Sequence, residues 1–245
     1  VRAGSCILGD DVGLGKTIQA LSAIEKTSGA RVLVLCPAIL KYQWQNEIKK
    51  FMPEATSVVI EGTSGAREEL WRQEARFHIA NYELLLKDLD IMKLQQWDYV
   101  VCDEATRISN IFTKTHKALR QLHATRRLAL TGTPISNHPQ ELWGIVNWTN
   151  PGLLGNYREF LDRYCVRNMF GGIFSYRDLE QLQKRVSHVM IRRHKEDVLK
   201  ELPPVIESEV PFRLGDDEHR LYQKIQKELL FDIEKAVIEK VENPM

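Results

Sequence analysis

The sequence has few of the features that mark secreted, zinc-bound or membrane proteins. It contains four cysteines, none of them paired as C-x-x-C, and no cysteine–histidine cluster has zinc-site spacing. No apolar run approaches the ~20 residues that span a bilayer, and no signal peptide opens the chain. We therefore expect an intracellular protein with reduced thiols and no membrane partner, in a nucleus or a bacterial cytoplasm.

The chain also lacks a strong net charge, internal repeats and low-complexity segments. Its 245 residues include 34 Lys and Arg against 33 Asp and Glu, so that the formal net charge is +1. Any surface that binds nucleic acid must therefore be local. Apolar residues make up 43% and charged residues 27%, the balance of a globular protein with a full core. The sequence does not begin with Met, and we expect it to be part of a longer chain.

Short apolar runs alternate with helical patterns over residues 1–150. The expected strands are Ser5–Gly9, Arg31–Cys36, Ser57–Glu61, Phe77–Asn81, Tyr99–Asp103 and Arg127–Thr131. The expected helices are Lys16–Thr27, Leu40–Phe51, Ala66–Arg76, Lys114–His123 and Pro139–Asn147. Several strands are continuously apolar, which is typical of parallel strands covered on both faces. The pattern predicts an α/β domain with a doubly wound parallel sheet.

The pattern changes after residue 150, where we expect a helical extension (151–215) and then one long helix (216–245). The expected elements are helices at Tyr157–Tyr164 and Arg177–His188 around a Gly171-Gly172 turn, a basic run at Lys184–Lys200, a β-like stretch at Val205–Phe212, and an amphipathic helix at Asp216–Val241. The apolar face of the last helix consists of Leu221, Ile225, Leu229, Ile233 and Val237, widened by Leu230 and Val241.

The strand at Ser5–Gly9 runs into a glycine-rich turn that ends in Lys16-Thr17, where a helix begins. This is the context of a phosphate-binding loop: glycines let backbone N–H groups point at phosphate oxygens, and the helix N-terminus favours negative charge. Lys16 is expected to neutralise the β- and γ-phosphates of ATP, and Thr17 to ligate Mg²⁺. Asp10 occupies the first glycine position of the strict pattern, so the match is to G-x-G-K-T of helicase-like ATPases. The expected nucleotide-binding residues are Asp10, Asp11, Val12, Gly13, Leu14, Gly15, Lys16 and Thr17.

A carboxylate pair, Asp103-Glu104, ends the strand that starts at Tyr99. The ends of neighbouring parallel strands face one crevice, so this pair should lie beside the phosphate-binding loop. We expect Asp103 to hold Mg²⁺ through water and Glu104 to act as general base toward the attacking water. The alternative is that the pair caps a following helix.

The motifs around these sites resemble those of SWI/SNF-type helicase-like ATPases, the superfamily-two DNA translocases. The matching segments are Asp10–Gln19 (D-E-M-G-L-G-K-T-x-Q in the family), Leu35–Leu40 with Trp44 and Glu47, Asn81–Glu83 (T-Y-E), Asp103–Asn110 (D-E-A-H-R-I-K-N), Leu130–Asn137 (L-T-G-T-P-I-Q-N) with Glu141–Trp143, and Ile191–Arg193 with Val198 and Glu201–Pro204. They occur in the family's order over most of the chain.

The resemblance implies a first RecA-like lobe with a family-specific extension and brace, in a motor that couples ATP hydrolysis to movement along double-stranded DNA. It implies that the last helix leads toward a second RecA-like lobe of the same full-length chain, which supplies arginine fingers. The upstream adenine segment would precede this sequence, and the piece alone should be a weak DNA-dependent ATPase. With the second lobe outside the sequence, the last helix should fold back on residues 157–200, pair with another copy, or fray. The residues expected at DNA or in coupling are Pro37, Lys41, Asn81, Thr131 and Thr133.

Several residues leave alternatives open. Thr106 and Ser109 replace the His and Lys of the family's carboxylate box, which keeps a nucleotide-gated interaction module without turnover under consideration. A strand-separating helicase of the same superfamily is the other alternative. Lys41 suits either a phosphate contact or a solvated charge, and Trp44 is expected to pack between helix and sheet. Arg192-Arg193 is interpreted as a brace between lobes rather than a DNA contact.

Overall fold

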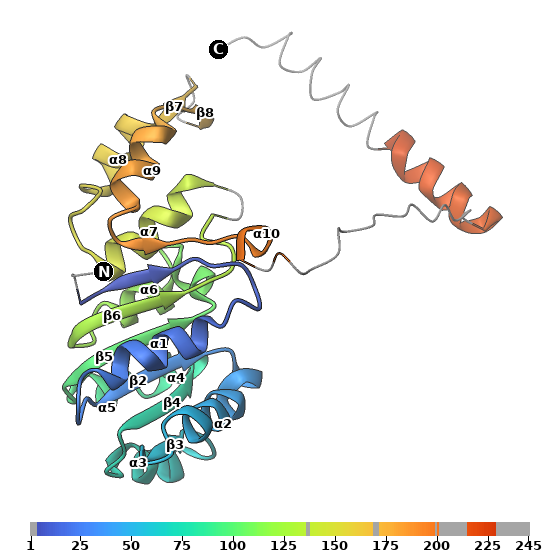
Figure 1. Ribbon diagram of the computed structural model, residues 1–245. Helices are drawn as coiled ribbons and strands as arrows, with labels where there is room; N and C mark the ends of the chain where they lie inside the picture. Colours follow the sequence, from blue (N-terminus) through green and yellow to red (C-terminus); the bar gives the residue numbers. More distant parts are fainter. Residues whose placement is uncertain (1–3, 136–137, 169–171, 199, 201–214, 229–245) are drawn as a thin grey trace. The chain divides into compact units, whose positions relative to one another are not determined.

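A sheet of seven parallel strands organises the described part of the chain, which comprises residues 4–135, 138–168, 172–198, 200 and 215–228 of this computed structural model (Figure 1). Its spatial order is β3-β4-β2-β5-β6-β1-β9. The strands are β1 (Cys6–Leu8), β2 (Val32–Cys36), β3 (Ser57–Val59), β4 (Phe77–Asn81), β5 (Trp97–Asp103), β6 (Ala124–Leu130) and β9 (Met190–Ile191). The predicted doubly wound parallel sheet is confirmed.

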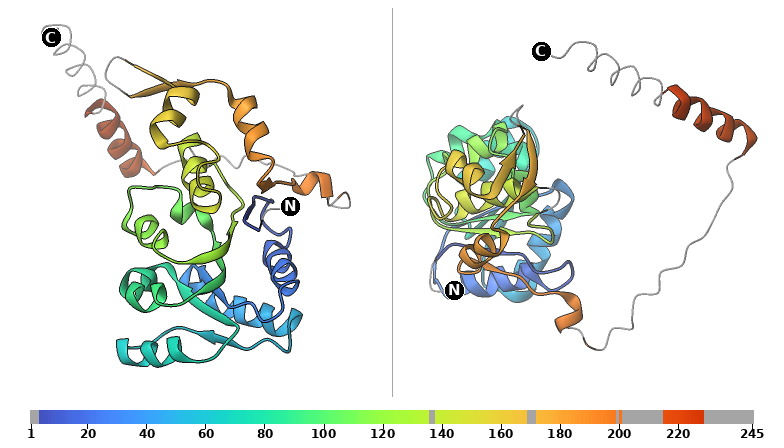
Figure 2. Two further views of the ribbon diagram at one scale, coloured as in Figure 1. Left: turned by 90° about the vertical axis from the view of Figure 1, so that its left-hand side faces the viewer. Right: turned by 90° about the horizontal axis from the view of Figure 1, so that it is seen from above.

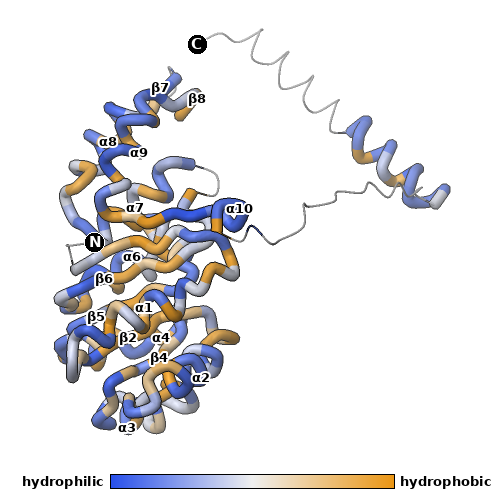
Figure 3. Tube along the Cα trace, in the orientation of Figure 1, coloured by the Kyte–Doolittle hydropathy of each residue, from blue (hydrophilic) through white to orange (hydrophobic). Residues whose placement is uncertain are grey.

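Strand β2 illustrates why the sheet is parallel and covered on both faces. All five of its residues are buried. Val32 and Val34 pack into one apolar cluster, whereas Leu33 and Leu35 pack into another. Because successive side chains of a strand point to opposite faces, each face needs its own layer of helices. In Figure 3 the strands through the middle of this unit carry the hydrophobic colour.

The two helical layers come from different parts of the sequence. One face is covered by α1 (Lys16–Glu25) and α2 (Lys41–Phe51), which contribute Leu21, Ile24, Trp44 and Ile48 to the core. The helices that supply the other cluster are α3 (Ser64–Arg72), α4 (Tyr82–Lys87), α5 (Leu89–Lys93), α6 (Lys114–Leu119) and α7 (Pro139–Thr149). Helices α4 and α5 lie in a stretch for which the sequence predicted no element, and the other helices match the predicted ones apart from their ends.

The segment after residue 150 is joined more closely to the lobe than the sequence suggested. It contains α8 (Tyr157–Tyr164), an antiparallel pair β7 (Cys165–Arg167) and β8 (Ile173–Tyr176), α9 (Leu179–Val186) and α10 (Lys195–Val198) (Figure 2). The expected basic run contains strand β9, which pairs in parallel with β1, Ile7 opposite Met190 and Leu8 opposite Ile191. The first compact unit of the chain is accordingly Val1–Lys200 and the second is Glu201–Met245.

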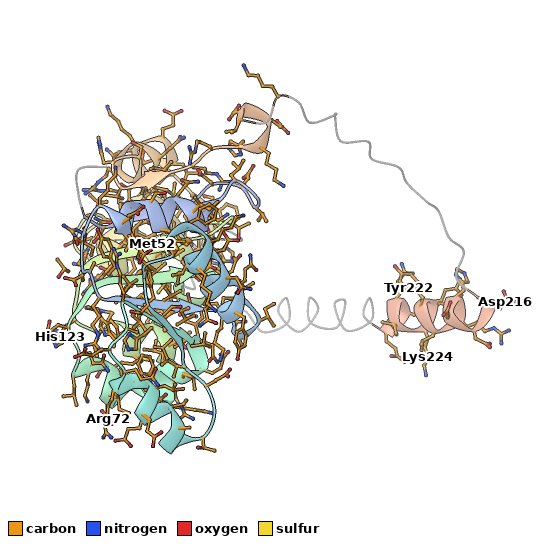
Figure 4. The ribbon with its side chains drawn as sticks, turned by 60° about the horizontal axis from the view of Figure 1, so that its bottom comes forward. Met52, Arg72, His123, Asp216, Tyr222 and Lys224 are labelled. Carbon is orange, nitrogen blue, oxygen red and sulfur yellow. The ribbon has the colours of Figure 1, made fainter. Side chains whose placement is uncertain are left out.

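In the second unit, the described residues 216–228 form a helix with Leu221 and Ile225 more than half exposed. Tyr222 and Lys224 project from opposite sides of it (Figure 4). The remaining residues of the predicted apolar face, and the β-like stretch Val205–Phe212, lie outside the described residues. Among the described helices, none is long and apolar enough to cross a membrane.

Candidate ATP site

The loop between β1 and α1 has the backbone of a phosphate cradle. Gly13 and Gly15 have φ values of 91° and 72°, in the left-handed region that a side chain disfavours. Helix α1 starts at Lys16, directly after Gly15. The unpaired N–H groups of its first turn and the positive end of its dipole therefore face the loop. This conformation explains why the sequence needs glycine at both positions.

Lys16 is folded onto this loop. Its Nζ donates hydrogen bonds to the carbonyl oxygens of Asp10 at 2.8 Å and Asp11 at 3.3 Å. A methyl group built on Gly132 would lie 3.8 Å from the same Nζ, so the Thr131–Thr133 turn borders the loop. Phosphate oxygens entering the cradle would compete with these carbonyls for the ammonium group. Thr17, the second residue of α1, is partly buried beside it.

Asp103 ends β5 with its carboxylate held by two donors. Trp44 Nε1 donates to Oδ2 at 2.9 Å, and the backbone N–H of Glu104 donates to Oδ1 at 3.0 Å. Burial raises the pKa of Asp103, although these two hydrogen bonds and the charge of Lys16 act in the opposite direction. The Tyr82 hydroxyl bonds the Asp103 carbonyl at 2.7 Å, which fixes the backbone at the same point.

Glu104 occupies a strained backbone position. Its φ of 50° and ψ of 56° place a residue with a long side chain in the left-handed region. Such conformations cost of order 1–3 kcal/mol and persist where the surroundings impose them, often at functional sites. The turn directs the chain from β5 into the short 3₁₀ helix Ala105–Ile108. The carboxylate pair thus lies at a tight turn at the strand end, whereas a helix-capping role would need a side-chain capping bond that Glu104 does not make.

Two residues expected to touch the nucleotide turn their carboxylates elsewhere. Asp10 is fully buried, and its carboxylate is bound by Arg193 and Gln19. Asp11 accepts the backbone N–H of Lys195 at 3.1 Å and pairs with the guanidinium of Arg192 at 3.5 Å. Val12 is exposed, and the carbonyl oxygen of Leu14 accepts a hydrogen bond from Gln19 Nε2 at 2.9 Å. Both carboxylates therefore point away from the cradle, and the backbone N–H of Asp11 is also occupied, by the Arg193 carbonyl at 3.1 Å.

The residues expected in coupling lie in two groups. Thr131 and Thr133 follow β6, whereas Pro37, Lys41 and Asn81 lie near the ends of β2 and β4. Thr131 is buried at the end of β6, its N–H bonds Leu8 at 3.0 Å, and its hydroxyl accepts the N–H of Thr133 at 3.1 Å. Pro37 directly follows β2, and Asn81 is the last residue of the neighbouring strand β4.

Lys41 belongs to the second group but is buried rather than solvated. Its ammonium donates to the Ile60 carbonyl at 3.0 Å and lies 3.6 Å from a Glu61 carboxylate oxygen. These two contacts give the buried Lys41 ammonium its partners within the fold. Asn81 Nδ2 donates to a Glu83 carboxylate oxygen at 2.5 Å, and Glu83 pairs with Arg107 at 3.5 Å.

The two substituted positions of the carboxylate box lie on the 3₁₀ turn after Glu104. The Ser109 hydroxyl donates to the Thr106 carbonyl at 2.8 Å, a local bond that closes the turn. Helix α7 crosses this turn at Gly144, where an added Cβ would lie 1.9 Å from the Ser109 carbonyl oxygen. Only glycine allows this approach, so the turn that follows the carboxylates is fixed by α7.

The donor set suits a nucleotide that brings its own magnesium ion. Among the described residues, no group of three His, Cys, Asp or Glu side chains forms a metal site of its own. Mg²⁺ is commonly bound by one or two protein oxygens together with substrate phosphates and water. Thr17 and Asp103 are the residues that would supply those oxygens, and Lys16 the cation for the phosphates.

Some of these site contacts had little signal in the sequence. The position of Trp44 in its helix predicts packing against the sheet, but the sequence gives no indication that its indole N–H bonds Asp103. Arg193 was interpreted as a brace between lobes, and it contacts the loop of its own lobe. The packing of Gly144 on Ser109 had no signal beyond a glycine inside a helix.

Comparison with known proteins points to one family. The family model for the SNF2-related domain matches residues 2–244. The TATA-binding protein-associated factor MOT1 of Saccharomyces cerevisiae is 34% identical over 97% of this chain, which covers 14% of that protein. Human SWI/SNF-related matrix-associated actin-dependent regulator of chromatin subfamily A member 1 is 31% identical over 89% of this chain and 22% of its own length. The chromatin-remodeling ATPase INO80 of Arabidopsis thaliana is 32% identical over 92% of this chain and 17% of its own length.

Solved structures agree. The SWI2/SNF2 ATPase core of Sulfolobus solfataricus in complex with double-stranded DNA superposes with a TM-score of 0.70 at 32% identity, covering 94% of this chain and 49% of that one. A second structure, of the Sulfolobus solfataricus SWI2/SNF2 ATPase core domain, gives a TM-score of 0.65 at 33% identity and covers 94% of this chain and 48% of that one. The chain thus spans about half of these cores and less than a quarter of the curated relatives.

Proposed function

The chain belongs to the SNF2-related family, and from this premise we propose that it is the ATP-binding lobe of a motor that moves along double-stranded DNA and remodels bound protein or DNA structure. The observation that carries the proposal is the placement of Lys16 in a glycine cradle, where its charge acts on Asp103, the residue next to Glu104. These are the groups that phosphoryl transfer needs: a cation on the phosphates, a metal-holding carboxylate and a base.

In this proposal each residue has one task. Lys16 and the N–H groups of the Gly13–Lys16 loop bind the β- and γ-phosphates of ATP, and Thr17 and Asp103 hold Mg²⁺. When bound, the ion neutralises charge on the phosphate oxygens. Trp44 keeps the Asp103 carboxylate oriented. Glu104 orients the attacking water and accepts its proton as general base.

The DNA substrate and a second lobe are proposed from the family. The similar core from Sulfolobus solfataricus is described in complex with double-stranded DNA, which supports a duplex as the partner. An arginine finger is worth ~10³–10⁵ in rate where it is supplied by a partner element. We propose that a second RecA-like lobe supplies it, so that this chain alone turns over ATP slowly. The proposed DNA partner supports a location inside the cell.

ATP turnover by the full-length protein, measured with and without duplex DNA, tests the proposal. We expect the duplex to stimulate turnover strongly and Glu104→Gln to abolish it. Nucleotide binding without turnover under both conditions would support the alternative of a nucleotide-gated module, for which Thr106 and Ser109 are the motivation. Displacement of one DNA strand during turnover would instead support a helicase.

A further inference from the structure

The strand pairing of β9 with β1 continues past the end of β1 into the phosphate-binding loop. Ile7 N–H bonds the Val189 carbonyl at 2.9 Å, and Gly9 N–H bonds that of Ile191 at 2.8 Å. The N–H of Asp11, inside the loop, bonds the carbonyl of Arg193 at 3.1 Å. The segment Val189–Arg193, about 180 residues later in the chain, therefore lies along one side of the loop and is hydrogen-bonded to it.

The buried carboxylate of Asp10 is the centre of this attachment. Arg193 donates to it through its backbone N–H at 2.9 Å, through Nε at 3.2 and 3.1 Å to the two oxygens, and through Nη2. Gln19 of α1 donates to Oδ2 at 3.0 Å and also to the Leu14 carbonyl at 2.9 Å. Burial alone would raise the pKa of Asp10, but these hydrogen bonds and the guanidinium charge lower it below its ordinary value.

This arrangement makes Asp10 dependent on one cation. A buried carboxylate is costly unless it is paired and fully hydrogen-bonded, and removing its partner is strongly destabilising locally. Arg193 also donates to Gln19 Oε1 at 2.6 Å, so that three side chains form one network beneath the loop. Arg192 adds a second link, from its Nη1 to the Gly9 carbonyl at 2.8 Å and the Gly132 carbonyl at 3.3 Å.

We propose that Arg193 is a positioning residue for the phosphate-binding loop, acting through Asp10. The inference rests on the proposed function, because it assumes that the loop binds ATP. Arginine suits this role better than lysine, since its planar fork serves both carboxylate oxygens and Gln19 together.

The test is a double-mutant cycle on the full-length protein with a fluorescent Mg·ATP analogue, combining Arg193→Ala and Asp10→Asn. Arg193→Ala should weaken nucleotide binding about tenfold or more, the scale expected when a binding loop is misplaced. The loss of affinity should exceed the loss of kcat at saturating ATP and DNA, because Arg193 contacts the loop and touches neither Asp103 nor Glu104. In the Asp10→Asn background the same change should cost much less, since the carboxylate that needs the cation is gone. Arg193→Lys should be intermediate.

Arg185→Ala is the matched control, because its guanidinium bonds the Leu153 carbonyl at 2.7 Å and makes no contact with the loop. It should bind nucleotide like wild type. Additive losses in the cycle, or equal losses in Arg185→Ala and Arg193→Ala, would overturn the proposal. If Arg193→Ala does not fold, Arg193→Lys carries the cycle. Failure of the wild-type protein to bind nucleotide would refute the proposed function itself, whereas binding by wild type with unchanged affinity in Arg193→Ala would refute only this inference.

Discussion

The indole of Trp44 and the carboxylate of Asp103 are joined by a 2.9 Å hydrogen bond, although they lie on different elements, α2 and the end of β5. The indole is 1% exposed and packs in the core between α2 and the sheet. One side chain therefore serves two purposes: its rings fill the core and its N–H fixes the proposed metal-holding carboxylate. A hydrogen-bond donor behind a metal-binding carboxylate fixes the orientation of that carboxylate, which would otherwise rotate.

The first prediction removes that hydrogen bond while keeping an aromatic ring. Trp44→Phe should raise the Mg²⁺ concentration needed for half-maximal ATP turnover by about tenfold, the scale found for lost outer-shell partners of metal ligands. A magnesium titration of ATPase activity measures it. Trp97→Phe is the control, because Trp97 is also 1% exposed but its Nε1 bonds the Met92 carbonyl at 3.1 Å. Equal shifts in the two variants would mean that Trp44 acts through packing alone.

The contact between α7 and the turn after Glu104 predicts a stability change. Gly144→Ala should lower the free energy of unfolding by about 3 kcal/mol, the upper end for overpacked sites, because the new Cβ would meet the Ser109 carbonyl at 1.9 Å. Gly65→Ala in α3 is the control, since an added Cβ there meets nothing within 4 Å. It should be neutral or slightly stabilising. Urea unfolding measures both, and a tolerated Gly144→Ala would contradict the close approach.

The buried His78 predicts a loss of stability in mild acid. Burial, with the charge of Arg31, lowers the pKa of His78 from 6.5 to about 4, although its hydrogen bond to the Gln73 carbonyl acts in the opposite direction. Between these values the unfolded chain binds a proton that the folded protein does not, so stability rises with pH across this range. The contribution of His78 to the free energy of unfolding is fully present above pH 6.5 and is lost as the pH falls toward 4. The total loss is about 3 kcal/mol.

Urea unfolding between pH 7 and pH 5 measures this effect, because few carboxylates titrate there. His78→Gln should flatten the dependence. Part of the slope should remain, since burial also lowers the pKa of His116. An unchanged slope in His78→Gln would show that His78 is protonated without cost in the fold.

Periodicity and motif spacing predicted the sheet and the phosphate-binding loop because both depend on local pattern. Continuous apolar runs mark strands covered on two faces, and Gly13, Gly15 and Lys16 must be neighbours to form the cradle. Strand β9 was not predicted because it has only two residues, and its apolar run, Val189–Ile191, is three residues long and lies within a basic segment. It exists as a strand because β1 offers an open edge.

The remaining site contacts depend on distances that one sequence does not contain. The motif predicts that Asp10 lies at the nucleotide. Its carboxylate instead bonds Arg193, which is 183 positions away in the sequence. Trp44 and Asp103 are 59 positions apart. Such pairs follow from the order of strands in the sheet, which is decided by tertiary packing rather than by local propensity.

Titration of the protein with a fluorescent Mg·ATP analogue tests the central claim most directly, with Lys16→Ala and Glu104→Gln beside wild type. Lys16→Ala should lose tight binding, because the phosphates lose their protein cation. Glu104→Gln should bind as well as wild type and not turn over, because it keeps the metal-holding carboxylate and removes the base. Equal loss of affinity in the two variants, or wild-type affinity in Lys16→Ala, would contradict the assignment of this site.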